Sequence, residues 1–135
     1  MKLRLRGDSL RLRLTQSEVF ALRDQGFWQD TTALGPAGGP SLAYRVESTD
    51  SAAPEVFFAK GDQAVVTIRI PSAEIAPWSQ STQVGIYFSE TWGLKVAVEK
   101  DFRCLDPSRD EDETDNFTNP NEGQGHAHLD ACDAD

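Results

Sequence analysis

Cationic side chains alternate with leucine near the start of the chain, at Lys2, Arg4, Arg6, Arg11 and Arg13. Successive side chains of a β-strand point to opposite faces, so this period of two gathers the cations on one face. Such a face, with Ser9 in the intervening turn, could bind phosphates or nucleic acid. Two other interpretations stay open: a solvated strand face partly paired with carboxylates, and a docking face for the chain's own acidic tail.

Four soft or borderline metal ligands occur late in the chain, at Cys104, His126, His128 and Cys132. Two thiolates and two imidazoles would form a chemically reasonable zinc tetrahedron. The spacing, however, matches no common zinc pattern. A small metal-binding protein is therefore one alternative, and unrelated residues in a tail are the other. No cofactor is expected.

The sequence Gly7-Asp8-Ser9-Leu10 spells the signature of GDSL esterases, in which the serine is the nucleophile. That family also needs an aspartate three residues before the catalytic histidine, and here those positions hold Gly123 and Gly125. We therefore predict a hairpin turn. No other arrangement in the sequence suggests catalysis, so we expect a protein that is not an enzyme, with no catalytic residues.

The alternation of apolar and polar residues, together with the turn residues between these stretches, predicts a mainly β (α+β) fold. Thr15-Gln16-Ser17-Glu18 forms a capping box, Gly26 is placed to end that helix, and Pro71-Ser72 opens a second short helix. The predicted strands span residues 2–6, 10–14, 27–32, 42–47, 55–59, 64–70, 83–89 and 94–100. The inward-facing positions of these strands and of the first helix predict a core of Leu12, Leu14, Val19, Leu22, Ile68, Ile70, Ile86, Phe88, Val96 and Val98.

Charge divides the chain of 135 residues into a body and a tail. Residues 105–135 hold ten acidic residues and one basic residue, which leaves twelve of each sign in residues 1–104. We expect one β-rich domain over residues 1–104 and a disordered acidic tail over residues 105–135 that could regulate the domain or bind a protein partner. No apolar run suits a signal peptide or a membrane span, so the cytoplasm is the expected location.

The body contains a weak internal repeat. Leu10–Val19 aligns with Val66–Ile75, and Arg13 then falls on Arg69 and Glu18 on Glu74. Two hairpin–helix–hairpin copies, at about residues 2–48 and 55–100, would close on each other as a monomer with pseudo-two-fold symmetry. The alternative is that any two strand–helix units look alike at this level.

Gly7-Asp8-Ser9 with Leu10–Leu14, and Ile68-Arg69-Ile70-Pro71 with Ala73-Glu74-Ile75, resemble AbrB/MazE-type regulators and antitoxins. The resemblance implies an internally duplicated, swapped-hairpin β-barrel-like fold. It also implies DNA contacts by the first hairpin, and an acidic tail that wraps a toxin. The sequence departs from the pattern at Asp8, where asparagine is usual, and in the second copy. The inherited contacts would be Arg4, Arg6, Asp8, Ser9, Arg11 and Arg13, whereas the second copy has Val56, Phe57, Phe58 and Thr67 where cations would be needed.

The ends of the chain resemble a small uncharacterised bacterial family. The matching stretches are KLRLRGDSLRLRLTQSEV at the start, then EKDFRCL and EDETDNFTNP. That resemblance implies no activity. The sequence as a whole therefore favours a non-enzymatic binding or interaction domain. The alternatives are an AbrB/MazE-like DNA-binding regulator or antitoxin, and a small metal-binding protein.

Overall fold

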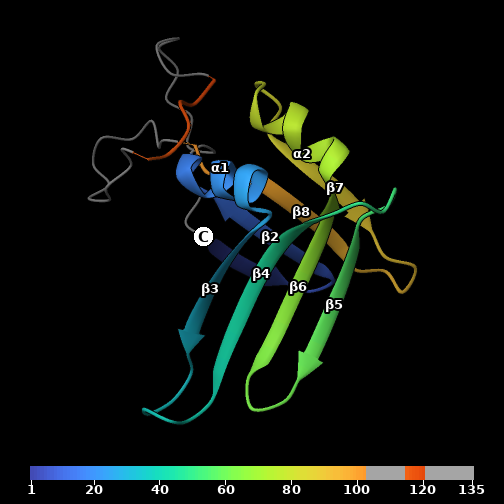
Figure 1. The fold of residues 1–135 in the computed structure, drawn as a ribbon. Helices are drawn as coiled ribbons and strands as arrows, with labels where there is room; N and C mark the ends of the chain where they lie inside the picture. The colour runs from blue at the N-terminus through green and yellow to red at the C-terminus, as the bar shows by residue number, and fades with distance from the viewer. Residues whose placement is uncertain (103–114, 121–135) are drawn as a thin grey trace.

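The computed structural model describes residues 1–102 and 115–120. These residues form eight strands and two helices, so the expected mainly β class is confirmed (Figure 1). In chain order the elements are β1 (Lys2–Arg6), β2 (Ser9–Leu14), α1 (Gln16–Gln25), β3 (Phe27–Ala33), β4 (Ser41–Thr49), β5 (Glu55–Lys60), β6 (Ala64–Pro71), α2 (Ser72–Ser79), β7 (Gly85–Ser89) and β8 (Lys95–Lys100).

The strands form two four-stranded mixed sheets. Sheet A has the order β1-β2-β8-β7, and sheet B has the order β3-β4-β6-β5. The outer pairs are antiparallel, and the central pairs, β2 with β8 and β4 with β6, are parallel. Each sheet therefore combines one hairpin from the first half of the chain with one from the second half.

This pairing places the connections at two ends of the molecule. The hairpin turns that follow β1, β3, β5 and β7 lie at one end of their sheets, which we call the turn end. Helices α1 and α2 contact each other and lie at the opposite end (Figure 1). In the part of the chain that the structure describes, helices thus cover one end of the fold.

The expected barrel is not confirmed. The two sheets stay separate among the described residues, since each has its own hydrogen-bonded strand order and no named strand belongs to both. Both sheets have open edge strands, β1 and β7 in sheet A, and β3 and β5 in sheet B. A pair of packed sheets replaces the closed barrel, because four short strands per layer can bury one face against the other layer without closing on themselves.

Local sequence explains the element boundaries. The Glu18 carboxylate accepts the backbone N–H of Thr15 at 2.8 Å, as the capping box predicts, and Gly26 ends α1 with a positive φ of 93°. Pro71 precedes the first residue of α2, and Pro77 lies in its last turn, so that helix stays short. These predicted starts and stops are confirmed.

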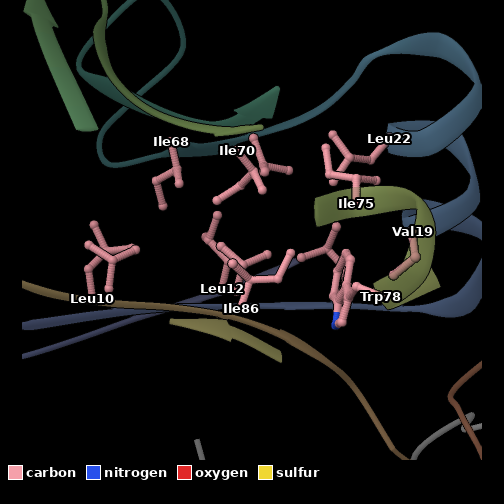
Figure 2. Packing of buried hydrophobic residues seen from close by; sticks show 13 residues of the cluster. Leu10, Leu12, Val19, Leu22, Ile68, Ile70, Ile75, Trp78 and Ile86 are labelled. Carbon is pink, nitrogen blue, oxygen red and sulfur yellow. The ribbon is translucent and has the colours of Figure 1, made fainter. Parts of the chain in front are cut away.

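The core lies between the sheets and beneath the helices (Figure 2). Nine of the ten predicted core residues are buried, and only Phe88 is half-buried, packed against the cluster. Trp78 of α2 is completely buried, and its indole N–H donates to the carbonyl of Val84 at 3.2 Å. The side of each strand that faces the core was therefore predicted correctly in both sheets.

One stretch of the predicted tail lies on the body. The N–H of Gln16 donates to the carbonyl of Asp115 at 2.8 Å, and the N–H of Phe117 donates to the carbonyl of Asp101 at 2.8 Å. The Phe117 ring packs edge-on against Phe102 with the centroids 5.9 Å apart. The expectation of a wholly disordered tail over residues 105–135 is therefore wrong at residues 115–120. The rest of that expectation lies outside the described residues.

Lys100 has the most buried side chain among the lysines and arginines of the described residues. Its side chain faces the core side of sheet A, where it lies between the rings of Trp78 and Phe117, at 5.9 Å and 5.1 Å from their centroids. Its ammonium donates to the carbonyl of Ser81. Desolvation lowers the pKa of Lys100. Lys100 therefore contacts both α2, through Trp78, and residues 115–120, which we call the returning segment, through Phe117.

Candidate functional site

The structure brings the six predicted anion-binding residues to one surface. Adjacent rows of β1 and β2 pair Lys2 with Arg13, Arg4 with Arg11, and Arg6 with Ser9. All six side chains lie on the face of sheet A that points away from the core, which we call the outer face. These side chains share one face because residues two apart in a strand point to the same side of the sheet, as the sequence indicated.

Strands β7 and β8 extend this face with residues that sequence reasoning missed. Parallel pairing puts Lys95 beside Ser9, Ala97 beside Arg11 and Glu99 beside Arg13. Tyr87 of β7 is in turn opposite Ala97. Nothing in the sequence indicates that these residues join the first hairpin, because the pairing connects strands about 85 residues apart.

A hollow of about 580 Å³ lies on the outer face. Ala97 has the smallest side chain in its row, so it leaves room between the arginines on one side and the Tyr87 ring on the other. Among the described residues, the lining includes four cations and no carboxylate. The main polar and aromatic side chains around the hollow are Arg4, Arg6, Ser9, Arg11, Tyr87 and Lys95.

Glu99 organises one side of this face. Its carboxylate accepts the Tyr87 hydroxyl at 2.7 Å, and the same group lies 3.1 Å from the Arg11 Nε and 3.9 Å from the Arg13 Nε. Burial and the hydrogen bond to the Glu99 carboxylate raise the pKa of Tyr87 to about 12. The phenol therefore stays neutral at physiological pH and is held in one orientation.

Gly85 leaves the space that the Tyr87 hydroxyl occupies. A Cβ at this residue would lie 2.9 Å from the Tyr87 hydroxyl and 2.8 Å from both the Glu99 Cγ and the Val98 carbonyl oxygen. These separations are too short for carbon contacts, so any larger residue would push the tyrosine away from Glu99. The absence of a side chain at this position therefore permits the Tyr87–Glu99 pair.

The outer face of sheet B has a different character, although its strands follow the same order. Its two arginines, Arg45 and Arg69, both donate to the carboxylate of Glu47, at 2.6 Å and 2.8 Å. In the register, Glu55, Phe57 and Ala59 take the places that the cations of β1 take in sheet A. The cationic surface therefore occurs on one sheet of the two.

The Gly7-Asp8-Ser9-Leu10 motif forms the predicted turn. Gly7 has a positive φ of 52°, and the Ser9 hydroxyl donates to the carbonyl of Arg6 at 2.7 Å across the turn. A nucleophilic serine would need its hydroxyl beside a base instead. The turn prediction for this motif is confirmed.

The predicted metal ligands Cys104, His126, His128 and Cys132 lie outside the described residues. Within residues 1–102 and 115–120, no group of three or more His, Cys, Asp or Glu side chains is arranged to hold a metal ion. The metal-binding alternative therefore stays a prediction. In the same part of the chain, no helix is long and apolar enough to cross a membrane.

Comparison with known proteins gives a family without an assigned role. No curated protein and no solved structure matches this chain. The resemblance to AbrB/MazE-type proteins therefore stays a prediction. The model of DUF7009, a family of unknown function, matches residues 1–121, a range that includes the returning segment at residues 115–120. The predicted membership of a small uncharacterised family is confirmed, and the chain belongs to DUF7009.

Proposed function

We propose that this domain is a binding module, and that it binds a phosphate-bearing ligand with a planar base on the outer face of sheet A. The observation that carries the proposal is the hollow lined by Arg4, Arg6, Arg11 and Lys95 and by the Tyr87 ring. Cations track phosphates, and an exposed aromatic ring stacks on bases. The Tyr87 side chain is suited to this because it is 58% exposed while its hydroxyl is held by Glu99.

The sheet arrangement favours single-stranded nucleic acid over a palindromic duplex site. A two-fold DNA site needs two equivalent basic surfaces. Here Arg13–Glu99 in sheet A corresponds to Arg69–Glu47 in sheet B, but the surrounding cations do not recur. One basic face of this width suits a short strand or a nucleotide. It does not suit the symmetric duplex that the AbrB/MazE alternative requires.

We also infer that the two halves arose by duplication. Exchanging β1, β2, β3 and β4 for β5, β6, β7 and β8 converts the strand order of one sheet into that of the other. Both parallel pairs also carry an arginine opposite a glutamate in equivalent rows. Under this proposal one copy kept or gained the ligand face, and the other became a structural partner.

Fluorescence anisotropy with a labelled oligo(dT) strand tests the proposed function. The paired change Arg6→Glu and Lys95→Glu should weaken binding at least ten-fold, because it reverses two charges beside the hollow. Tyr87→Ala should weaken it by about 1–3 kcal/mol if a base stacks there. Lys60→Glu, a single charge reversal in sheet B, is the control and should change the affinity little.

The salt dependence completes the test. Three or four phosphate contacts on a single strand give a log–log slope of roughly −2 to −3. Equal loss in the Lys60→Glu control, or binding that ignores salt, would contradict a site on the outer face. Tighter binding to a duplex than to the single strand would instead favour the DNA-regulator alternative.

The acidic block at residues 110–113 remains a predicted competitor for this face. It lies outside the described residues. Changing its carboxylates to amides (Asp110→Asn, Glu111→Gln, Asp112→Asn, Glu113→Gln) should strengthen oligonucleotide binding at low salt, and the gain should vanish near roughly 0.3 M salt. This variant keeps residues 115–120, which a deletion from residue 106 would remove.

A further inference from the structure

A second hollow opens between the two sheets at the turn end. It has a volume of about 530 Å³, and the nine described residues that line it all have apolar side chains. They come from both layers and include Leu5 and Leu10 of sheet A, Leu42, Phe58 and Val66 of sheet B, and Trp92 in the β7–β8 turn. We call this hollow the apolar cleft; it lies on the inner faces of the sheets, apart from the cationic outer face.

Three side chains of this lining are much more exposed than core side chains usually are. Leu5, Phe58 and Trp92 are 63%, 66% and 65% exposed, although the cleft continues directly into the buried layer around Leu12 and Ile68. Exposed apolar side chains that converge from two sheets carry a free-energy cost that scattered single residues do not. The helices lie at the opposite end of the molecule (Figure 1), whereas this cleft opens at the turn end.

Among the described residues, Lys60 is the one cation on the inner face of sheet B. In β5, Phe58 pairs with Val66 and Lys60 pairs with Ala64, so Lys60 is two residues beyond Phe58 on the inner face. Lys60 is exposed and is the last residue of the strand, next to the turn. The inner face of β5 therefore runs from apolar to cationic toward the turn end.

From this gradient we propose that the apolar cleft binds a single-chain anionic amphiphile, a long-chain carboxylate, with the carboxylate beside Lys60 and the alkyl chain between the sheets. An apolar volume of this size lies within the range of small-molecule sites. The complementary charge at the end of the apolar lining favours a charged head group over a wholly apolar molecule. The proposal does not depend on the nucleic-acid function, because the two sites use opposite faces of sheet A.

Isothermal titration with decanoate, dodecanoate and tetradecanoate, on the full chain below their micelle concentrations, tests the proposal. Each two-methylene step should tighten Kd by about 15-fold while the chain still fits, since each buried methylene contributes about four-fold. A brominated dodecanoate should quench tryptophan fluorescence in the wild-type chain, and the quenching should largely disappear in Trp92→Phe. Trp92 is the one tryptophan that lines the cleft.

Matched variants locate the site. Phe58→Glu should weaken dodecanoate binding at least ten-fold, and Leu34→Glu should leave it unchanged. Leu34 is a suitable control because it is 62% exposed but does not line the cleft. Lys60→Glu should weaken dodecanoate binding but not dodecanol binding. Thermal unfolding of each variant checks that the fold is intact. We expect an intact fold because the substituted side chains are exposed.

Two outcomes would overturn the proposal. The first is binding that is undetectable or independent of chain length. The second is concentration-dependent dimerisation in sedimentation velocity that Phe58→Glu abolishes and Leu34→Glu does not, because the occupant would then be a second copy of the chain. The paired change Arg6→Glu and Lys95→Glu should leave dodecanoate binding intact, so failure of this proposal and failure of the nucleic-acid proposal can be told apart.

Discussion

At the scale of single residues, the Tyr87–Glu99 pair defines the outer face of sheet A. The hydrogen bond of 2.7 Å fixes the ring beside the hollow, and Gly85 leaves the space that the hydroxyl occupies. The same carboxylate orients Arg11 through a contact of 3.1 Å. One glutamate therefore positions both the aromatic and the cationic walls of the candidate site.

The phenol titration gives a direct check on this pair. In Tyr44→Phe protein, where Tyr87 is the remaining tyrosine, ultraviolet absorbance should report a pKa near the value of about 12 given by the structure. Glu99→Gln should lower the pKa of Tyr87 toward 10.0, but only in part, because desolvation is the larger cause of the shift. A pKa of Tyr87 that Glu99→Gln leaves unchanged would mean that the pair does not form in solution.

The sign of the associated pH effect follows from the raised pKa. Between pH 10 and about 12 the folded state holds the Tyr87 proton more tightly than the unfolded state does. The contribution of this group to stability is thus fully present below pH 10 and is lost as pH rises through the pKa of the folded state. Glu99→Gln should reduce that loss in alkaline urea titrations.

At the scale of elements, two carboxylates from distant parts of the chain accept hydrogen bonds at the N-terminus of α1. Glu18 caps the first turn from within the helix, and Asp115 reaches it from the returning segment. The Asp115 carboxylate accepts the Ser17 N–H at 3.1 Å and the Ser17 hydroxyl at 2.5 Å. A negative group at a helix N-terminus is favourable, since unpaired N–H groups and the helix dipole converge there.

Removing the Asp115 carboxylate should destabilise the fold. Asp115→Ala should cost about 0.5–2 kcal/mol in urea unfolding at neutral pH, the usual range for a lost N-terminal cap. The hydrogen bonds from Ser17 lower the pKa of Asp115, so this contribution is present above the ordinary pKa of 3.8 and is lost as pH falls through the lowered value. Thr118→Ala, an exposed position in the same segment, should be neutral. Equal effects of the two changes would contradict a capping role.

At the scale of the whole molecule, both halves of the chain contribute to each sheet and share one core. Ile68 of sheet B and Leu12 of sheet A belong to the same cluster, together with residues of both helices (Figure 2). Neither half contains a complete sheet, because the central parallel pairs join strands from different halves. We therefore expect a single cooperative unfolding transition.

A cavity in this shared core should weaken the entire molecule. Ile68 is 1% exposed, and Ile68→Ala should cost about 2–5 kcal/mol of unfolding free energy. Thr67→Ala is the matched control, since Thr67 neighbours Ile68 on the opposite face of β6 and should lose less than about 1 kcal/mol. A loss well under 1 kcal/mol for Ile68→Ala would mean that the core is not shared in this way.

The amino-acid sequence alone determined the local structure. Alternation of leucine with arginine, the capping box at Thr15 and Gly26 at the helix end predicted elements that the structure contains, and the phase of each strand predicted the core and the common face of the cations. These features depend on backbone geometry over a few neighbouring residues, which residue types specify directly.

Only the tertiary structure decided which elements meet. Lys95, Tyr87 and Glu99 join the cationic face, Lys100 enters the core side, and Asp115 returns to α1 because of pairings between residues far apart in the chain. The separate sheets, in place of the expected barrel, are a choice of the same kind. Several strands share the same alternation of apolar and polar residues, so each could pair with more than one partner. Which strands pair depends on burial and loop closure over the whole fold, and short-range sequence patterns do not specify it.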